Sequence, residues 1–228
     1  KVWKHDNTWY MVIGYGKDGL GKALIYTSND LHSWTCKGPA IESDGTMGDM
    51  WECPDLFPIG EGDSHALIIS PMNTGSYKNL YITGTFDYST CRLQKLHGAP
   101  IDYGFDFYAP QTLVDEQGRR IMIAWMNIWG AKMPEQDHGW YGAMTLPREL
   151  TLESDGTLRS RPIKELEQLR RERIVKLDFA LEVGRQKTVD GVHGPALELV
   201  VRIAPKDAAK VGLRMFISAD GASYAELS

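Results

Sequence analysis

The chain has 228 residues, 43% of them apolar, which is enough for one large domain or for one domain and part of another. Its net charge is −5 with both signs mixed along the chain, so the charge favours neither a nucleic acid nor another polyanion as partner. No apolar run approaches the roughly 20 residues of a membrane span. The three cysteines are widely spaced and are interpreted as buried thiols, which leaves the compartment unassigned.

Three segments of the chain repeat one pattern of short apolar strands separated by polar turns, with a spacing of about 55 residues. Four short strands in each repeat are typical of the blades of a β-propeller. A propeller needs about four to eight blades to close. Either the chain therefore oligomerises, or blades are missing at its N-terminus, and we favour the second. The expected strands are 2–4, 9–14, 23–27 and 34–36, then 56–58, 65–70, 79–83 and 91–94, then 112–114, 120–125, 143–146 and 157–159.

The pattern changes after the third repeat. Residues 163–173 contain good helix formers with an apolar stripe and predict a linker helix. Strand patterns return at 174–179, 196–203 and 211–217, with a hairpin turn at 219–221. The sequence therefore predicts an all-β protein: three blades over 1–162, the linker over 163–173, and the start of a β-sandwich over 174–228.

Two overlapping glycine motifs begin at Gly14 and Gly16 and match nucleotide-binding patterns. Both patterns require a helix to follow, whose N-terminus would hold phosphates, but a strand follows here. We assign these glycines to a flexible hairpin loop. The six histidines have no metal-ligand spacing, so the sequence implies neither a nucleotide cofactor nor a catalytic metal.

A single carboxylate, Glu52, lies within the run 51–57 at the start of a strand. Alternation along a strand directs Trp51 and Cys53 to one face and Glu52 to the other, and Pro54 is expected to hold Cys53 in an extended conformation. A carboxylic acid partly desolvated by aromatic neighbours can serve as a proton donor.

The next repeat places a second acidic residue at a similar position. Pro54 and Pro110 are 56 residues apart, so the run 106–110, which begins with Asp106, occupies the place that matches the run around Glu52. Because the first strands of propeller blades line one central channel, we expect both carboxylates to point toward one mouth. Trp125 ends the second strand of the last repeat, and Trp129 lies in the loop beyond it.

With these runs in this order, the chain resembles glycoside hydrolase family 32, the β-fructosidases, which include invertases, sucrose-6-phosphate hydrolases, levanases and inulinases. The matching runs are 51–57 (Trp-Glu-Cys-Pro-Asp-Leu-Phe), 106–112 (Asp-Phe-Tyr-Ala-Pro-Gln-Thr), 123–126 (Ile-Ala-Trp-Met) and 139–150 (Gly-Trp-Tyr-Gly-Ala-Met-Thr-Leu-Pro-Arg-Glu-Leu), with 27–34 as an outer hairpin. The resemblance covers residues 1 to about 162.

The resemblance implies a five-bladed propeller followed by a β-sandwich, and retaining hydrolysis of terminal β-D-fructofuranosides. It makes Glu52 the general acid/base, and Asp106, Tyr108 and Trp125 substrate-binding residues. The partner would be sucrose, sucrose 6-phosphate or a fructan, with no cofactor. Cys53 is expected to pack beside the acid, and Arg148 and Glu149 to form a structural ion pair.

The family's nucleophile, an Asp in an Asn-Asp-Pro-Asn-Gly motif, has no counterpart in this sequence. A retaining glycosidase needs two carboxyl groups about 5–5.5 Å apart. The chain is therefore expected to be a fragment with three of five blades, inactive by itself. Two other functions stay open: a carbohydrate-binding propeller without catalysis, and a fructosyltransferase or related five-bladed glycosidase that uses the same residues.

Overall fold

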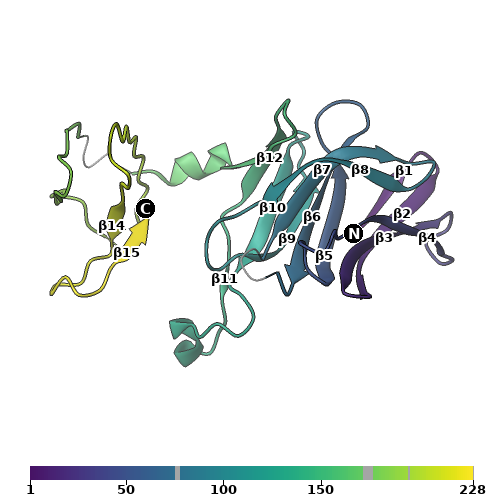
Figure 1. The fold of residues 1–228 in the computed structure, drawn as a ribbon, viewed down its shortest axis with the longest axis horizontal. Helices are drawn as coiled ribbons and strands as arrows, with labels where there is room; N and C mark the ends of the chain where they lie inside the picture. Colours follow the sequence, from purple (N-terminus) through teal and green to yellow (C-terminus); the bar gives the residue numbers. More distant parts are fainter. Residues whose placement is uncertain (75–77, 172–176, 195, 228) are drawn as a thin grey trace. The chain divides into compact units, whose positions relative to one another are not determined.

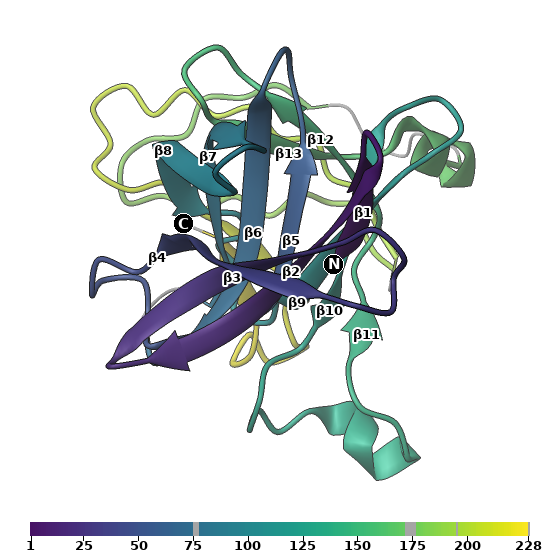
Figure 2. The same ribbon diagram turned by 90° about the vertical axis from the view of Figure 1, so that its right-hand side faces the viewer.

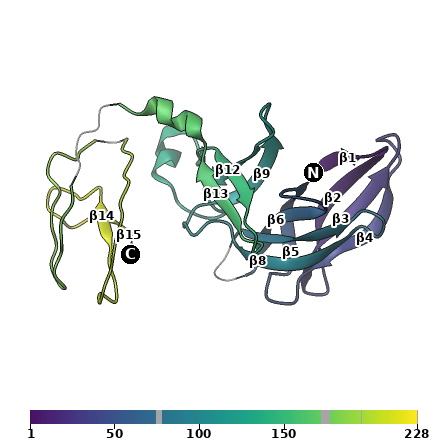
Figure 3. The same cartoon turned by 90° about the horizontal axis from the view of Figure 1, so that it is seen from above.

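The computed structural model describes residues 1–74, 78–171, 177–194 and 196–227, and the chain divides into two compact units, Lys1–Lys164 and Glu165–Ser228. The first unit contains three antiparallel sheets that follow one another in chain order (Figures 1 and 3). Among the described residues, no helix has the length and apolar character that crossing a membrane requires.

The first two sheets each contain four strands in simple meander order, as the repeat predicts. A meander forms because each short polar turn brings the next strand back beside the one before it. The first sheet contains β1 (Val2–His5), β2 (Thr8–Lys17), β3 (Leu20–Ser28) and β4 (Thr35–Glu42), and the second contains β5 (Met50–Pro58), β6 (Ser64–Met72), β7 (Leu80–Asp87) and β8 (Arg92–Pro100).

The third sheet departs from this order at its third strand, which was expected at 143–146. Only Ala143–Met144 forms a strand, β11, and it pairs with the far end of β10. Pro147 has no backbone N–H that could donate a hydrogen bond to a neighbouring strand, so the strand does not continue through it. The chain pairs with β10 again as β12, which begins at Arg148. The sheet contains β9 (Tyr108–Val114), β10 (Arg120–Met126), β11, β12 (Arg148–Leu152) and β13 (Leu158–Pro162), and a 3₁₀ helix, η1 (Pro134–His138), lies in the loop before β11.

The second sheet is covered on both faces, and this fixes the order of the layers. Leu67 and Ile69 of β6 belong to a core shared with the first sheet, whereas Ala66 and Ile68 belong to a core shared with the third. Successive side chains of a strand alternate between faces, so one apolar run serves both cores. Figure 2 shows the first sheet in front of β5 and β6.

Within its described residues, the second unit contains fewer helices and strands than the sequence predicts. The expected linker helix is a short 3₁₀ helix, η2 (Lys164–Leu169), with no buried residue to stabilise a longer one. β14 (Leu213–Met215) and β15 (Ala225–Leu227) form the expected hairpin. Residues 177–179 and 196–203 have no ladder partner within the described ranges, and the remaining parts of these expectations, at 172–176, lie outside those ranges.

The glycines of the first hairpin are not loop residues, so that expectation is wrong for three of them. Gly14 and Gly16 lie within β2, and Gly21 lies within β3. A Cβ on Gly14 would lie 1.8 Å from the carbonyl oxygen of Trp51, and a Cβ on Gly21 would lie 2.2 Å from its indole ring. These glycines therefore let β5 and the fully buried Trp51 approach the first sheet closely.

We expect Gly14→Ala to lower the free energy of unfolding by about 2 to 3 kcal/mol, because the new methyl group meets backbone atoms that cannot turn aside. The measurement is the chemical denaturation midpoint. Gly19→Asn is the matched control, since Gly19 has φ +75° with open space around it and Asn tolerates that conformation. Equal midpoints for the two variants would show that β2 and Trp51 are not in this close contact.

Candidate active site

A cavity of about 570 Å³ opens where β2, β5, β9 and β10 come together. It contains three of the four residues that the sequence assigns to the site: Glu52, Tyr108 and Trp125. Asp106 is half-buried and is not among the lining residues. The lining residues are Gly14, Met50, Trp51, Glu52, Cys53, Tyr108, Ala109, Trp125, Trp129 and Tyr141.

Two β-bulges shape this cavity, and both lie just before the prolines of the repeat. Cys53 and Ala109 each have φ 49°, in the left-handed region. The expectation that Cys53 is extended is therefore wrong. The register of β5 against β6 shifts between Glu52 and Asp55, so that Cys53 and Pro54 together oppose one residue of β6 and β5 contains one extra residue. Bulges of this kind re-aim side chains, and left-handed non-glycine residues are typical of functional sites.

The hydroxyl of Tyr108 donates a hydrogen bond of 2.5 Å to Oε2 of Glu52. Tyr108 is buried, and β9 pairs it directly with Trp125 of β10. Burial raises the pKa of Tyr108, and the hydrogen bond and negative charge of Glu52 raise it further. The phenol therefore stays protonated and holds one oxygen of the Glu52 carboxylate in a fixed place.

Aromatic rings form one wall of the cavity. Trp129 lies edge-on to Trp125, with centroids 5.3 Å apart, and also to Tyr108, with centroids 6.4 Å apart. The ring of Tyr141 is tilted against that of Trp125, with centroids 5.9 Å apart. No site role was expected for Tyr141 or Gly14, although Tyr141 lies inside the run 139–150 that carries the family resemblance.

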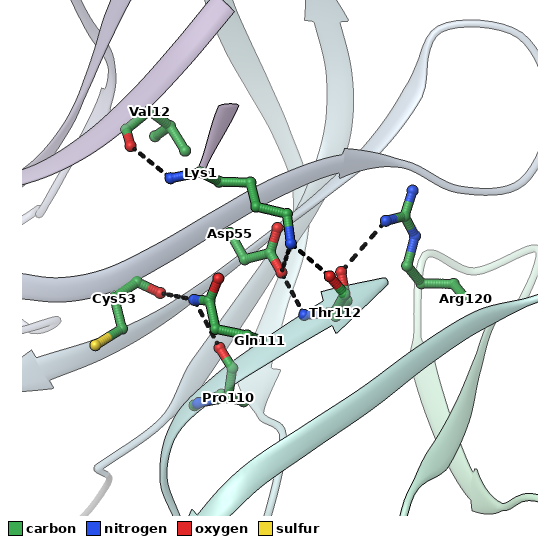
Figure 4. Close-up of polar contacts among 8 residues, drawn as sticks. All are labelled: Lys1, Val12, Cys53, Asp55, Pro110, Gln111, Thr112 and Arg120. Carbon is green, nitrogen blue, oxygen red and sulfur yellow. Dashed lines mark hydrogen bonds and ion pairs between the residues drawn. The ribbon is translucent and has the colours of Figure 1, made fainter. Parts of the chain in front are cut away.

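A polar brace joins the strand of Glu52 to β9 (Figure 4). Asp55, fully buried on β5, accepts a hydrogen bond of 2.6 Å from the backbone N–H of Thr112 and lies 3.4 Å from Nζ of Lys1. Gln111 donates a 3.0 Å hydrogen bond from its side chain to the carbonyl oxygen of Cys53. A buried carboxylate needs hydrogen-bond donors, and a residue in a strained backbone conformation needs contacts that hold it there. These contacts therefore fix the bulge beside Glu52.

Arg148 forms its ion pair with Asp102, at 2.7 Å, and its guanidinium lies 5.0 Å from the centroid of the Phe107 ring. The expected pairing with Glu149 is wrong, because neighbouring residues of β12 point to opposite faces. Arg148 nevertheless has a structural role, since it fixes the segment that leads into β9.

The three cysteines differ from the expectation of buried thiols. Cys91 is buried, but Cys36 and Cys53 are exposed. Partial burial of the Cys53 thiol raises its pKa, because it disfavours the charged thiolate. The negative charge of Glu52 adds to this effect. A thiol with a raised pKa is a poor nucleophile. Among the described residues, no group of three or more His, Cys, Asp or Glu side chains is placed to hold a metal ion.

Comparison with known proteins identifies the class. The model for the N-terminal domain of glycosyl hydrolases family 32 matches residues 1–162. Sucrose-6-phosphate hydrolase of Escherichia coli is 42% identical over 181 residues, which cover 75% of this chain and 37% of that protein. Raffinose invertase of Escherichia coli is 41% identical, with the same coverage. The chain thus spans well under half the length of these relatives.

A solved structure supports the same assignment. A family 32 β-fructofuranosidase of Bombyx mori, a mutant in complex with sucrose, superimposes with a TM-score of 0.69 at 36% identity, over 76% of this chain and 39% of that one. The first unit therefore has the fold of the β-propeller glycosidases. The chain belongs to glycosyl hydrolases family 32.

We expect Glu52→Gln to lower the pKa of Tyr108, because the variant removes the negative charge that disfavours the phenolate. Burial, the larger cause of the shift, should still keep that pKa above its ordinary value. The measurement is a pH titration by NMR with labelled tyrosine rings. Tyr88, whose pKa is raised mainly by burial, is the control and should not change. An unchanged Tyr108 titration would show that its hydroxyl does not contact Glu52 in solution.

Proposed function

We propose that the protein containing this chain hydrolyses a terminal β-D-fructofuranoside with retention of configuration, and that Glu52 is its general acid/base. The observation that carries the proposal is the contact between Glu52 and Tyr108 inside an aromatic cavity. Membership in family 32 and the names of the relatives, which include sucrose-6-phosphate hydrolases, supply the reaction class.

In this mechanism Glu52 first donates a proton to the glycosidic oxygen of the leaving group, and then removes a proton from the water that completes hydrolysis. The first step requires a protonated carboxyl group held in one orientation. The hydrogen bond from Tyr108 to Oε2 provides the orientation, and in this proposal the other carboxyl oxygen, Oε1, carries the proton that is transferred.

A second carboxylate is needed as nucleophile, about 5–5.5 Å from the first. Among the described residues that line the cavity, Glu52 is the only one with a carboxyl group. We propose that the nucleophile belongs to a part of the protein beyond these 228 residues, because the relatives are more than twice as long as the matched segment.

The proposal assigns substrate contacts to the other predicted residues. Tyr108 and Trp125 form the floor and one wall of the cavity, where flat ring faces suit a sugar. Asp106, outside the lining, would reach the fructosyl hydroxyls only in the assembled protein. The domain assignment is also proposed: residues 1–162 are three blades of a five-bladed propeller, 163–173 a linker, and 174–228 part of a β-sandwich.

The lone carboxylate also favours a second candidate, a carbohydrate-binding propeller without catalysis. Binding requires the cavity and its aromatic rings but no second acid. The two candidates differ in one property, because only the enzyme would need Glu52 to be ionisable.

In the full-length protein, we expect Glu52→Gln to lower kcat for sucrose by about a hundred- to ten-thousand-fold, the usual contribution of a positioned acid/base. The exposed Glu61→Gln is the control and should leave kcat unchanged. The 228-residue polypeptide alone should show no sucrose hydrolysis.

Three outcomes would overturn parts of this account. A full-length protein that binds fructosides without turning them over would be the non-catalytic binder. Full activity in Glu52→Gln would remove Glu52 from the mechanism. Turnover by the 228-residue polypeptide that Glu52→Gln abolishes would place the nucleophile within these residues.

A further inference from the structure

The two bulges of the cavity are equivalent positions of the sequence repeat. The runs 52–54 and 108–110 begin 56 residues apart, and each ends in proline. The middle residue of each run has φ 49°, and in each run two residues oppose a single residue of the next strand. Glu52 and Tyr108, which contact each other in the cavity, are therefore the same position of two successive repeats.

Gln111 joins the two bulges through its side-chain amide (Figure 4). Its Nε2 donates a hydrogen bond to the carbonyl oxygen of Cys53 and another to the carbonyl oxygen of Pro110, each at 3.0 Å. An amide NH₂ group has two hydrogens, so these bonds use both of its donors. The amide thereby links the backbone just after Glu52 to the backbone just after Tyr108.

The bulge at Ala109 has a second anchor, on the second sheet. Ser70 of β6 accepts a 3.1 Å hydrogen bond from the N–H of Ala109 and donates one of 3.1 Å to Oδ1 of Asn79. The Asn79 amide donates in turn to the carbonyl oxygen of Phe107. Ser70 and Asn79 are buried. They hold the residues on both sides of Tyr108, so this ring has a fixed place against which the other bulge is set.

The contact between Glu52 and Tyr108 depends closely on the separation of the two bulges. A hydrogen bond between two oxygen atoms extends from about 2.5 to 3.0 Å, so a shift of about 1 Å would break it. Gln111 is not among the residues that line the cavity. Its amide can therefore act on the reaction through the position of the carboxyl group.

We infer that Gln111 is a positioning residue, whose amide sets the separation of Glu52 and Tyr108 and thereby aims the carboxyl group at the glycosidic oxygen. The inference rests on the proposed fructosidase function. It assigns to Gln111 an effect on the rate of proton transfer and none on the binding of the sugar.

The first test is Gln111→Met in the full-length protein, which removes both donors and keeps a side chain of similar size. The variant should lower kcat for sucrose by about ten- to a hundredfold and change KM by less than about twofold, because the acid is displaced while the cavity is kept. Gln94→Met is the matched control. Gln94 is an exposed glutamine of β8 outside the cavity, and its variant should behave as the wild type.

The second test is Gln111→Glu, because a carboxyl group donates a hydrogen bond only when it is protonated. At pH 7 this variant should be as slow as Gln111→Met. At about pH 4.5, near the ordinary pKa of a glutamic acid, its kcat relative to the wild type at the same pH should rise at least about fivefold, whereas that of Gln111→Met should not. The other ionisable groups of the joined strands are common to the two variants: Glu52, Cys53 and Asp55 of β5, Tyr108 of β9 and Arg120 of β10, with Lys1 beside Asp55.

A third measurement needs no turnover. The contact with Glu52 raises the pKa of Tyr108, so Gln111→Met should lower that pKa in an NMR titration. An unchanged Tyr108 titration would overturn the amide bridge itself. A wild-type kcat in Gln111→Met, or no recovery of Gln111→Glu in acid, would overturn the positioning role. A full-length wild type that does not hydrolyse fructosides would overturn the proposed function, and the Tyr108 titration would still decide whether the bridge exists.

Discussion

The close approach of β2 to the backbone of Trp51 is the constraint on which the rest of the site depends. Gly14 leaves no side chain between the two strands, and the ideal Cβ position at Gly14 lies 1.8 Å from the Trp51 carbonyl oxygen. The indole N–H of Trp51 donates to the carbonyl oxygen of Met47 at 2.7 Å, so the side chain of Trp51 is held as well as its backbone. Because Glu52 follows Trp51 directly, its carboxylate starts from a fixed point.

The bulges at Cys53 and Ala109 place unfavourable backbone conformations beside the acid, and the surrounding contacts hold them there. Each residue precedes a proline and has a left-handed φ, which is costly for a residue with a Cβ. The side chain of Gln111 binds the Cys53 carbonyl oxygen, and Asp55 binds the backbone of Thr112. The strained backbone and the hydrogen bonds that hold it thus occur together, as expected where a side chain must be positioned accurately.

The sequence predicted the parts of the fold that follow from periodicity. Alternating apolar strands with short polar turns indicated the three sheets, and the repeat related Pro54 to Pro110, which led to Glu52 and Tyr108. Contacts between distant segments could not be predicted in this way. Gly14 and Gly21 resembled loop glycines because the close approach of Trp51 comes from another sheet. Cys53 was expected to be extended because the residue before proline usually is, and the bulge overrides that preference. Asp106 was related to Glu52 only because both lie in the matching runs before Pro54 and Pro110, and Asp106 is not among the residues that line the cavity.

A crystal structure of the full-length Glu52→Gln variant with sucrose would test the central claim most directly. The account predicts that the glycosidic oxygen lies about 3 Å from the side chain of residue 52, within hydrogen-bond reach. The fructosyl ring should lie over Trp51 and Tyr108. Sucrose bound with its glycosidic oxygen facing another carboxyl group, and residue 52 in contact only with Tyr108, would contradict the assignment of Glu52 as the acid/base.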